Sequence, residues 1–151
     1  MNVVEFHTLA ADSDSQRLRG ACALIEKAYL DGGRVLVWLD DEASLNAFDN
    51  LLWTFGDRSF VPHEPLSADP AACEAPVQLT AAAELPSTVF DSGFTALCAL
   101  RARGEAAALR FGRVIEVVDA EPSRRDAGRQ RFRFYREQGI TPRHFEMAAR
   151  A

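Results

Sequence analysis

Acidic residues at the end of a predicted strand are the first candidates for chemistry in this 151-residue chain. Asp40, Asp41 and Glu42 directly follow the apolar run RVLVWL, and an acidic pair at such a position can bind magnesium. The same residues are typical of a helix start, because an aspartate N-cap accepts backbone N–H groups and the helix dipole favours acids there. We favour the helix cap. A nucleotide- or metal-dependent α/β enzyme that uses Asp40 and Asp41 is the alternative.

The histidines and cysteines form no local catalytic or metal-binding motif. His7, His63 and His144 are far apart, and the three cysteines show no C-x-x-C spacing. This pattern argues against a zinc ribbon and against a disulfide framework, and Cys22 and Cys98 are expected to be small core residues. The chain also lacks the G-x-S-x-G nucleophile elbow and both glycine-rich phosphate-binding motifs. We therefore expect no catalysis, metal or cofactor, and a protein that binds another molecule.

The first binding feature is an arginine-rich stripe near the C-terminus. Spacing of i, i+4, i+7 and i+11 places four residues on one face of a predicted helix: Arg125, Arg129, Phe132 and Arg136. Arginine binds carboxylates through paired hydrogen bonds, and an aromatic ring beside it offers apolar contact. The stripe suits an acidic peptide that ends in a hydrophobic residue, with Gly128 leaving a dent beside the Phe132 ring. The alternative is an ordinary amphipathic helix with Phe132 and Tyr135 in the core.

The second binding feature is an aromatic loop in the stretch NLLWTFGDRSFVPHEP. Its large aromatic residues surround a Gly-Asp turn, and two prolines follow: Trp53, Phe55, Phe60, Pro62 and Pro65. Prolines lower the entropic cost of presenting side chains to a partner, and tryptophan near arginine is typical of binding hot spots. The alternative is a loop that folds its aromatic rings back to plug the end of the sheet.

Charge is unevenly distributed along the chain. Residues 121–151 contain eight arginines and four acids and carry +4, whereas the whole chain carries −5. A general nucleic-acid binder is usually basic as a domain, whereas a local basic patch on an acidic body suits a local anionic partner. Direct DNA binding by the arginine helix stays open as a further hypothesis.

Strand and helix patterns alternate along the chain and must position both binding features. Continuous apolar runs bounded by turn residues predict strands, and apolar residues at helical spacing predict helices. The predicted strands are 2–9, 34–39, 76–80, 94–100 and 112–119; the predicted helices lie within 12–33, 42–53, 104–111 and 122–139. The segment ITPRHFEM follows the last helix without a predicted element.

This alternation predicts a three-layer α/β sandwich with a mostly parallel sheet and helices on both faces. The length and the 48% hydrophobic content suit a single domain over residues 1–151. No signal peptide precedes the first predicted strand, and the longest apolar runs are too short to cross a membrane, so a cytoplasmic protein is expected.

The aromatic loop and, later in the chain, the arginine-rich stripe occur together in one known family. Along essentially its whole length the chain resembles the chi subunit family of the bacterial DNA polymerase III holoenzyme. Two stretches carry this resemblance: GGRVLVWLDDEASLNAFDNLLWTFGDRSFVPH and GRQRFRFYREQG. The resemblance implies a non-catalytic clamp-loader accessory subunit with a nucleotide-binding-like topology that lacks the nucleotide motif.

The resemblance also implies two protein partners. Members bind the psi subunit, and the matching residues here are Trp53, Phe60, Val61 and Pro62. Members also bind the acidic, phenylalanine-terminated C-terminal tail of single-stranded DNA-binding protein, and the matching stripe is Arg125, Arg129 and Phe132, with Arg136 beside it. Members often carry lysine and tyrosine where this chain has Arg125 and Phe132. DNA is then contacted only indirectly, and a helicase is a further partner that would compete for the psi surface.

Overall fold

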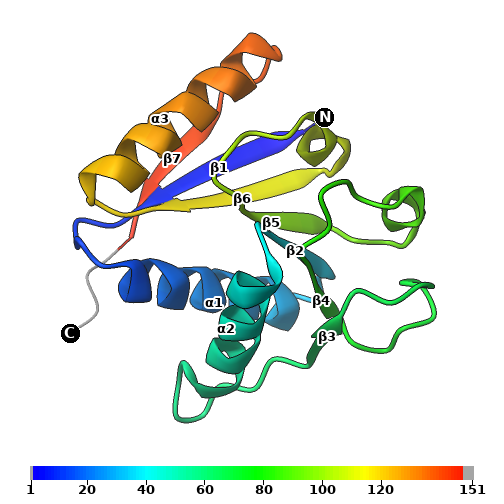
Figure 1. The fold of residues 1–151 in the computed structure, drawn as a ribbon. Helices are drawn as coiled ribbons and strands as arrows, with labels where there is room; N and C mark the ends of the chain where they lie inside the picture. Colours follow the sequence, from blue (N-terminus) through cyan, green and yellow to red (C-terminus); the bar gives the residue numbers. More distant parts are fainter. Residues whose placement is uncertain (1, 148–151) are drawn as a thin grey trace.

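The computed structural model describes residues 2–147. Strands, α-helices and two short 3₁₀ helices alternate along the chain (Figure 1). The elements are β1 (Val3–Thr8), α1 (Asp14–Leu30), β2 (Val35–Leu39), α2 (Glu42–Thr54), β3 (His63–Pro65), β4 (Val77–Thr80), η1 (Ser87–Asp91), β5 (Ala96–Leu100), η2 (Ala106–Arg110), β6 (Arg113–Val118), α3 (Pro122–Glu137) and β7 (Arg143–Glu146).

The seven strands of the described chain form one sheet in the order β3-β4-β2-β5-β6-β1-β7. Every strand pair in it is parallel, so the predicted mostly parallel sheet is parallel throughout these residues. The chain moves from β1 through β2 to the edge strand β3, and then from β4 through β5 and β6 to the opposite edge strand β7. All carboxyl ends of the strands therefore lie along one end of the sheet.

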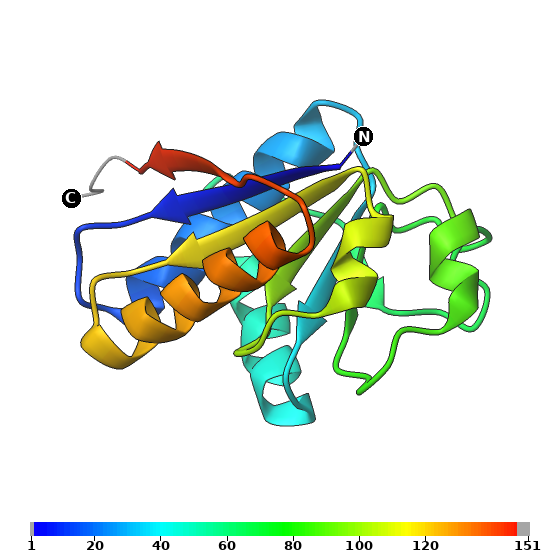
Figure 2. The same cartoon turned by 90° about the horizontal axis from the view of Figure 1, so that it is seen from above.

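Helices cover both faces of the sheet, which confirms the three-layer sandwich (Figure 2). Helices α1 and α2 pack on one face, and α3 packs with η1 and η2 on the other. The buried strand β2 serves both layers: Val37 faces α1 and α2, whereas Trp38 faces the opposite cluster. Alternating side chains of a strand point to opposite faces, which is why an uninterrupted apolar run such as β2 must be covered on both.

Each α-helix begins at a residue whose side chain accepts a backbone hydrogen bond. Ser13 accepts from the N–H of Gln16, and Glu121 accepts from that of Arg124. Asp41 accepts from the N–H of Ser44 at 2.7 Å, as the helix-cap interpretation predicts. The bonds from Ser44 lower the pKa of the Asp41 carboxyl.

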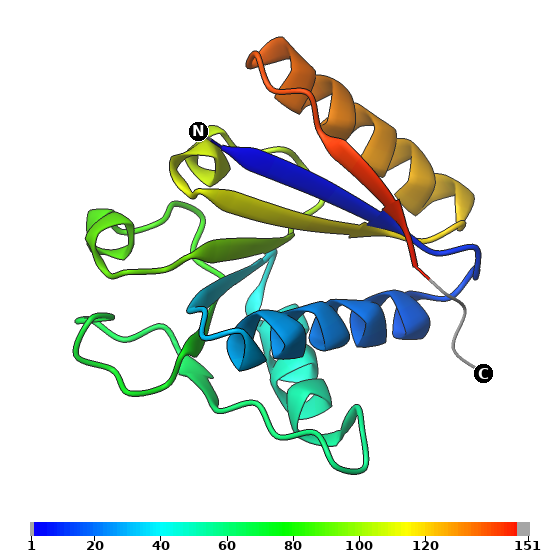
Figure 3. The same ribbon diagram turned by 180° about the vertical axis from the view of Figure 1, so that it is seen from behind.

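Two edge strands are not indicated by the sequence patterns. The first, β3, includes Pro65, which suits an edge because proline has no N–H to donate. The second, β7, runs beside β1 where the sequence predicts no element (Figure 3). Gly139 has a φ of 87° and ends the helix that precedes β7. None of the helices between residues 2 and 147 combines the length and apolar character needed to span a bilayer.

Candidate interaction surfaces

The first candidate site lies at the end of α2, and we call it the aromatic surface: Trp53, Phe60 and Pro62. Trp53 is 49% exposed and Phe60 is 62% exposed, although large aromatic side chains are usually buried. Their ring centroids are 5.8 Å apart, so the two rings form one continuous patch. The loop does not fold these two rings back onto the sheet. Phe55 does pack partly against the core, as the plug interpretation predicts for the loop aromatics.

Side-chain burial differs from residue to residue where the loop enters β3. Phe60 points outward, whereas Val61 is fully buried and His63 is 5% exposed. Val61 packs in the core with α1 and α2, so its side chain does not share the aromatic surface, contrary to what the resemblance implies. Pro62 is half-buried.

The second candidate site is the outer face of α3, and we call it the basic surface: Arg125, Arg129, Phe132, Arg133 and Arg136. Its four arginines are exposed and Phe132 is half-buried. The inner side of Phe132 packs on Phe6 of β1, with ring centroids 5.2 Å apart. Tyr135 is only 1% exposed and belongs to the core. The amphipathic-helix interpretation therefore holds for Tyr135, while Phe132 lies at the border between core and solvent.

Residues of the basic surface line two separate hollows. An open hollow of about 560 Å³ is lined by Arg129, Phe132, Arg133, Arg136 and Glu137. Arg125, one turn earlier, instead lines a hollow of about 540 Å³ together with His144 of β7. The sequence stripe does not include Arg133, which lies one turn after Arg129 at i, i+4. That spacing is the signal that could have identified it.

Gly128 lies on the inner side of α3 and leaves no dent beside Phe132. A Cβ atom at this position would be 2.9 Å from one methyl group of Val118 and 3.0 Å from the other. The α3 backbone therefore lies close against β6 at Gly128, and the predicted role beside the ring is wrong. The glycine sets how near the basic surface lies to the sheet.

A buried polar cluster holds the inner side of α3 to β6. The Glu116 carboxylate accepts a hydrogen bond from Arg131 Nε at 2.9 Å on one oxygen and from the Tyr135 hydroxyl at 2.8 Å on the other. Burial raises the pKa of Glu116, and the Arg131 charge acts in the opposite direction. Burial and the adjacent Glu116 also raise the pKa of Tyr135. Because Arg131 and Tyr135 are one turn apart, the cluster fixes the rotation of α3 and so presents the arginines of the basic surface outward.

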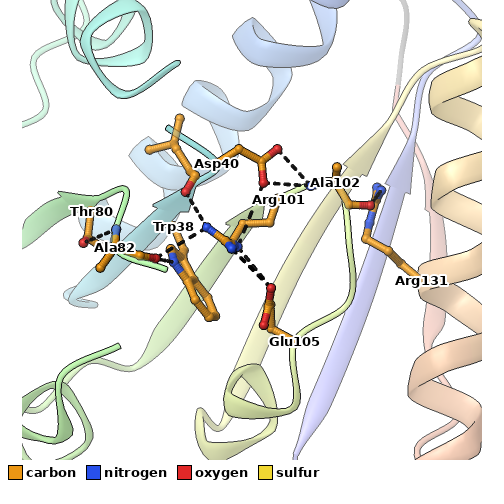
Figure 4. Close-up of polar contacts among 9 residues, drawn as sticks. Trp38, Asp40, Thr80, Ala82, Arg101, Ala102, Glu105 and Arg131 are labelled. Atoms are coloured by element: carbon orange, nitrogen blue, oxygen red, sulfur yellow. Dashed lines mark hydrogen bonds and ion pairs between the residues drawn. The ribbon is translucent and has the colours of Figure 1, made fainter. Parts of the chain in front are cut away.

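Protein side chains cross-link the carboxyl ends of the central strands, where open α/β sheets often bind ligands (Figure 4). The Arg101 guanidinium donates to the carbonyl oxygen of Leu39 at 2.9 Å and to Glu105 at 3.3 Å. It also lies 4.6 Å from the centre of the Trp38 ring. Asp40 accepts from the N–H of Ala102 at 3.1 Å. These residues join β2 to the segment after β5.

A small cleft of about 230 Å³ lies beside this network, between the start of α1 and α3. Its arginines have protein partners: Arg17 pairs with Asp14 at 2.7 Å, and Arg124 pairs with Asp119 at 2.7 Å. The two candidates for metal chemistry also have protein partners, because Asp40 accepts from the N–H of Ala102 and Asp41 from that of Ser44. Within residues 2–147, no group of three His, Cys, Asp or Glu side chains could hold a metal ion.

Comparison with known proteins matches the chain to one family. The sequence model of the family described as "DNA polymerase III chi subunit, HolC" matches residues 1–143. A curated relative from Pseudomonas aeruginosa, named DNA polymerase III subunit chi, is 38% identical over 139 residues, which cover 92% of this chain and 92% of that protein.

A second relative with the same name comes from Escherichia coli strain K12. It is 30% identical over 119 residues, which cover 79% of this chain and 78% of that protein. Both relatives are named as a subunit of DNA polymerase III, in agreement with an accessory role without catalysis of its own. The match over residues 1–143 and the two relatives show that this chain belongs to the DNA polymerase III chi subunit family.

Proposed function

We propose that this chain is a clamp-loader accessory subunit that bridges two proteins. It binds a psi subunit through the aromatic surface and the acidic tail of single-stranded DNA-binding protein through the basic surface. The observation that carries the proposal is the hollow on α3, where three arginines surround a half-buried phenylalanine ring. No chemical step is part of this function, and DNA is reached only through its binding protein.

The basic surface has the chemistry that an acidic, phenylalanine-terminated tail requires. Exposed guanidinium groups can pair with aspartate side chains and with the terminal carboxylate, while the Phe132 ring offers the apolar contact. A hydrogen bond to a charged group contributes about 1.5–3 kcal/mol, so removing one arginine should weaken binding by roughly 10- to 100-fold. Attraction between exposed charges is screened by salt, so affinity should fall as ionic strength rises.

Titration with a synthetic acidic tail peptide tests the basic surface directly. We expect Arg129→Ala to weaken binding by roughly 10- to 100-fold. Arg110→Ala is the matched control, because Arg110 is also exposed but lies on η2, and it should leave the affinity unchanged. A peptide with an amidated C-terminus should also bind less tightly. Equal affinities for wild type and Arg129→Ala would rule out the basic surface as the tail site.

The aromatic surface has the composition of a binding hot spot. Two exposed aromatic rings in contact, Trp53 and Phe60, offer a large apolar area that a partner chain could cover. Their neighbour Pro62 restricts the backbone, so less entropy is lost when the loop is bound. These features favour a protein partner over a small molecule.

Co-expression with the psi subunit of the same organism tests the aromatic surface. We expect Trp53→Ala to abolish co-purification and to leave tail-peptide binding intact. Phe145→Ala is the matched control, since Phe145 is 42% exposed on the opposite edge strand and should have no effect on psi. Loss of both interactions in Trp53→Ala would mean that Trp53 supports the fold. A helicase that competes for the same surface should be displaced by added psi and should also fail to bind Trp53→Ala.

A further inference from the structure

The small cleft at the carboxyl ends of the strands lies where open α/β sheets commonly bind ligands. Strands β1 and β6 are neighbours, but the helices that follow them, α1 and α3, cover opposite faces of the sheet. Ligands bind to such sheets where the connections diverge in this way. The cleft lies between the start of α1 and the first half of α3, and its volume is about 230 Å³.

Positive side chains predominate among the charged groups that line this cleft. They are four arginines and two aspartates, which together sum to +2: Arg17, Arg101, Arg124, Arg131, Asp14 and Asp40. The first turns of α1 and α3 also contribute to the lining, and a helix N-terminus adds partial positive charge. A phosphoryl group carries about −1.5 to −2 charges at pH 7, so its charge is nearly opposite to that of the lining.

Arg17 and Arg124 keep terminal N–H groups that have no hydrogen-bond acceptor among residues 2–147. Arg17 bonds to Asp14 through Nε alone, at 2.7 Å, so both of its Nη atoms remain without a partner. Arg124 bonds to Asp119 through Nε at 2.9 Å and through Nη2 at 2.7 Å. Its Nη1 is 3.9 Å from Glu121, which is too long for a hydrogen bond.

Arg131 adds a further free N–H group from a nearly buried side chain. This residue is only 8% exposed. Its Nε donates to Glu116 at 2.9 Å and its Nη1 donates to the carbonyl oxygen of Ala102 at 3.1 Å (Figure 4). Nη2 takes part in neither bond and is not enclosed by protein, so it opens to the cleft that Arg131 lines. An oxygen acceptor in the cleft would complete its hydrogen bonding.

Two buried acids hold these guanidinium groups in place. Glu116 is 1% exposed and Asp119 is 2% exposed, and they bind Arg131 and Arg124 from the protein side. The two arginines are therefore ordered before a ligand arrives, which lowers the entropic cost of binding. The same acids offset two of the positive charges, so we expect a modest affinity, with a dissociation constant on the order of 1 mM.

We propose that this cleft binds one phosphoryl group of a small molecule through the terminal N–H groups of Arg17, Arg124 and Arg131. Guanidinium groups pair with phosphate oxygens through parallel hydrogen bonds. The volume lies below the roughly 300–1,000 Å³ of pockets for drug-sized ligands, and the loop between β1 and α1 lacks the glycines that a dinucleotide requires. The ligand is therefore free phosphate or a small phosphomonoester. This site is separate from both surfaces of the proposed function.

Titration of the full chain with inorganic phosphate, followed by amide NMR, tests the site. The amide signals of Ala102 and Ala127, which line the cleft, should shift and saturate together. Arg17→Gln should bind phosphate about tenfold more weakly, because it removes two free N–H-bearing nitrogens. Arg19→Gln is the matched control, since Arg19 is exposed on the same helix outside the cleft. Equal affinities for wild type and Arg17→Gln would overturn the inference.

The basic surface on α3 also carries arginines, so the titration must distinguish the two places. Arg129→Ala should leave the shifts of Ala102 and Ala127 and their midpoint unchanged. Shifts confined to the outer face of α3, lost in Arg129→Ala, would assign phosphate to the basic surface and contradict the proposal. Ribose 5-phosphate should bind at least as tightly as inorganic phosphate, and ribose alone should not bind. Binding of ribose alone would contradict recognition of a phosphoryl group.

Thermal unfolding gives a second measurement that does not depend on NMR signals. A ligand at ten times its dissociation constant should raise the melting temperature of wild type by roughly 3–6 °C. Phosphate also stabilises proteins in general, because it is excluded from their surfaces. The decisive quantity is therefore the rise in wild type minus the rise in Arg17→Gln. A positive difference supports the site, and equal rises in the two proteins would refute it.

Discussion

Tyr135→Phe should destabilise the fold, because it removes one hydroxyl from the buried cluster under α3. The Tyr135 hydroxyl donates to Glu116 Oε2 at 2.8 Å, and the other carboxylate oxygen is already bonded to Arg131. The variant therefore leaves a fully buried carboxylate oxygen without a partner. A hydrogen bond to a charged group contributes about 1.5–3 kcal/mol, so we expect a loss of about 2 kcal/mol in the free energy of unfolding. For a chain of this size, the melting temperature should fall by roughly 4–8 °C.

Urea denaturation of the variant and a matched control measures this loss. The chain has two tyrosines, and the other is Tyr29, which is half-buried and whose hydroxyl has no hydrogen-bond partner among residues 2–147. Tyr29→Phe should stay within about 0.5 kcal/mol of wild type. The dependence on urea should keep its slope, since the same surface is exposed on unfolding. Equal midpoints for the two variants would refute the buried cluster as an anchor of α3.

Absorbance at alkaline pH gives an independent check on the same hydroxyl. Burial and Glu116 raise the pKa of Tyr135, so the folded state keeps a proton that the unfolded state loses near pH 10. The contribution of Tyr135 to stability is therefore complete below about pH 10 and is lost as the pH rises above it. The Tyr135 hydroxyl should therefore ionise only when the protein unfolds, and an absorbance change from Tyr135 before unfolding would contradict its burial.

Three further variants or reactions test other contacts. Gly128→Ala brings a methyl group to 2.9 Å from Val118, so overpacking should outweigh the gain in helix propensity and destabilise the fold by about 1 kcal/mol. A double-mutant cycle with Val118→Ala should show favourable coupling, because the smaller side chain makes room for the methyl group. Simple additivity of the two changes would contradict the close approach. Burial raises the pKa of Asp119, but bonds from Arg124 outweigh it and the pKa lies below its usual value. Asp119→Asn should therefore destabilise at pH 7 and progressively less as the pH falls below about 4, whereas an equal penalty in urea titrations at both pH values would argue against the ion pair. Burial raises the pKa of Cys22 to about 12 and also raises that of the buried Cys98, whereas the bond to Glu64 raises the pKa of Cys73, which is only half-buried. A thiol reagent should therefore modify Cys73 before the other two cysteines in folded protein, and all three after unfolding.

The layers of the fold were predictable because their signals are local. The run from Val35 to Leu39 is apolar at every position, and all five residues are buried. The caps at Asp41 and Glu121 lie directly before their helices, so sequence distance and spatial distance agree. Such patterns require only neighbouring residues, and the α/β sandwich follows from them.

Features that depend on distant residues were not predictable in the same way. Strand β7 pairs with β1, which lies more than 130 residues earlier in the chain, and its four residues are all exposed and show no apolar pattern. The contact between Gly128 and Val118 depends on how α3 docks on the sheet. Val61 is buried in the core directly before β3, a short strand that its sequence does not indicate.

The two candidate surfaces differed in what their sequences revealed. Helical spacing identified Arg129 and Phe132 correctly as neighbours on the outer face of α3. It could not show that Arg125 lines a different hollow, since that depends on the position of β7.

The order of strands in the sheet sets the distance between the two proposed partners. The aromatic surface lies beside the edge strand β3, whereas α3, which carries the basic surface, packs on β6 and β1 near the opposite edge. Four to five strand spacings of about 4.8 Å place these strands roughly 19–24 Å from β3. The sheet keeps the two surfaces at a fixed separation, so both partners can bind at the same time. Their affinities should be independent, and the benefit of binding both comes from tethering, which raises the local concentration of one partner near the other.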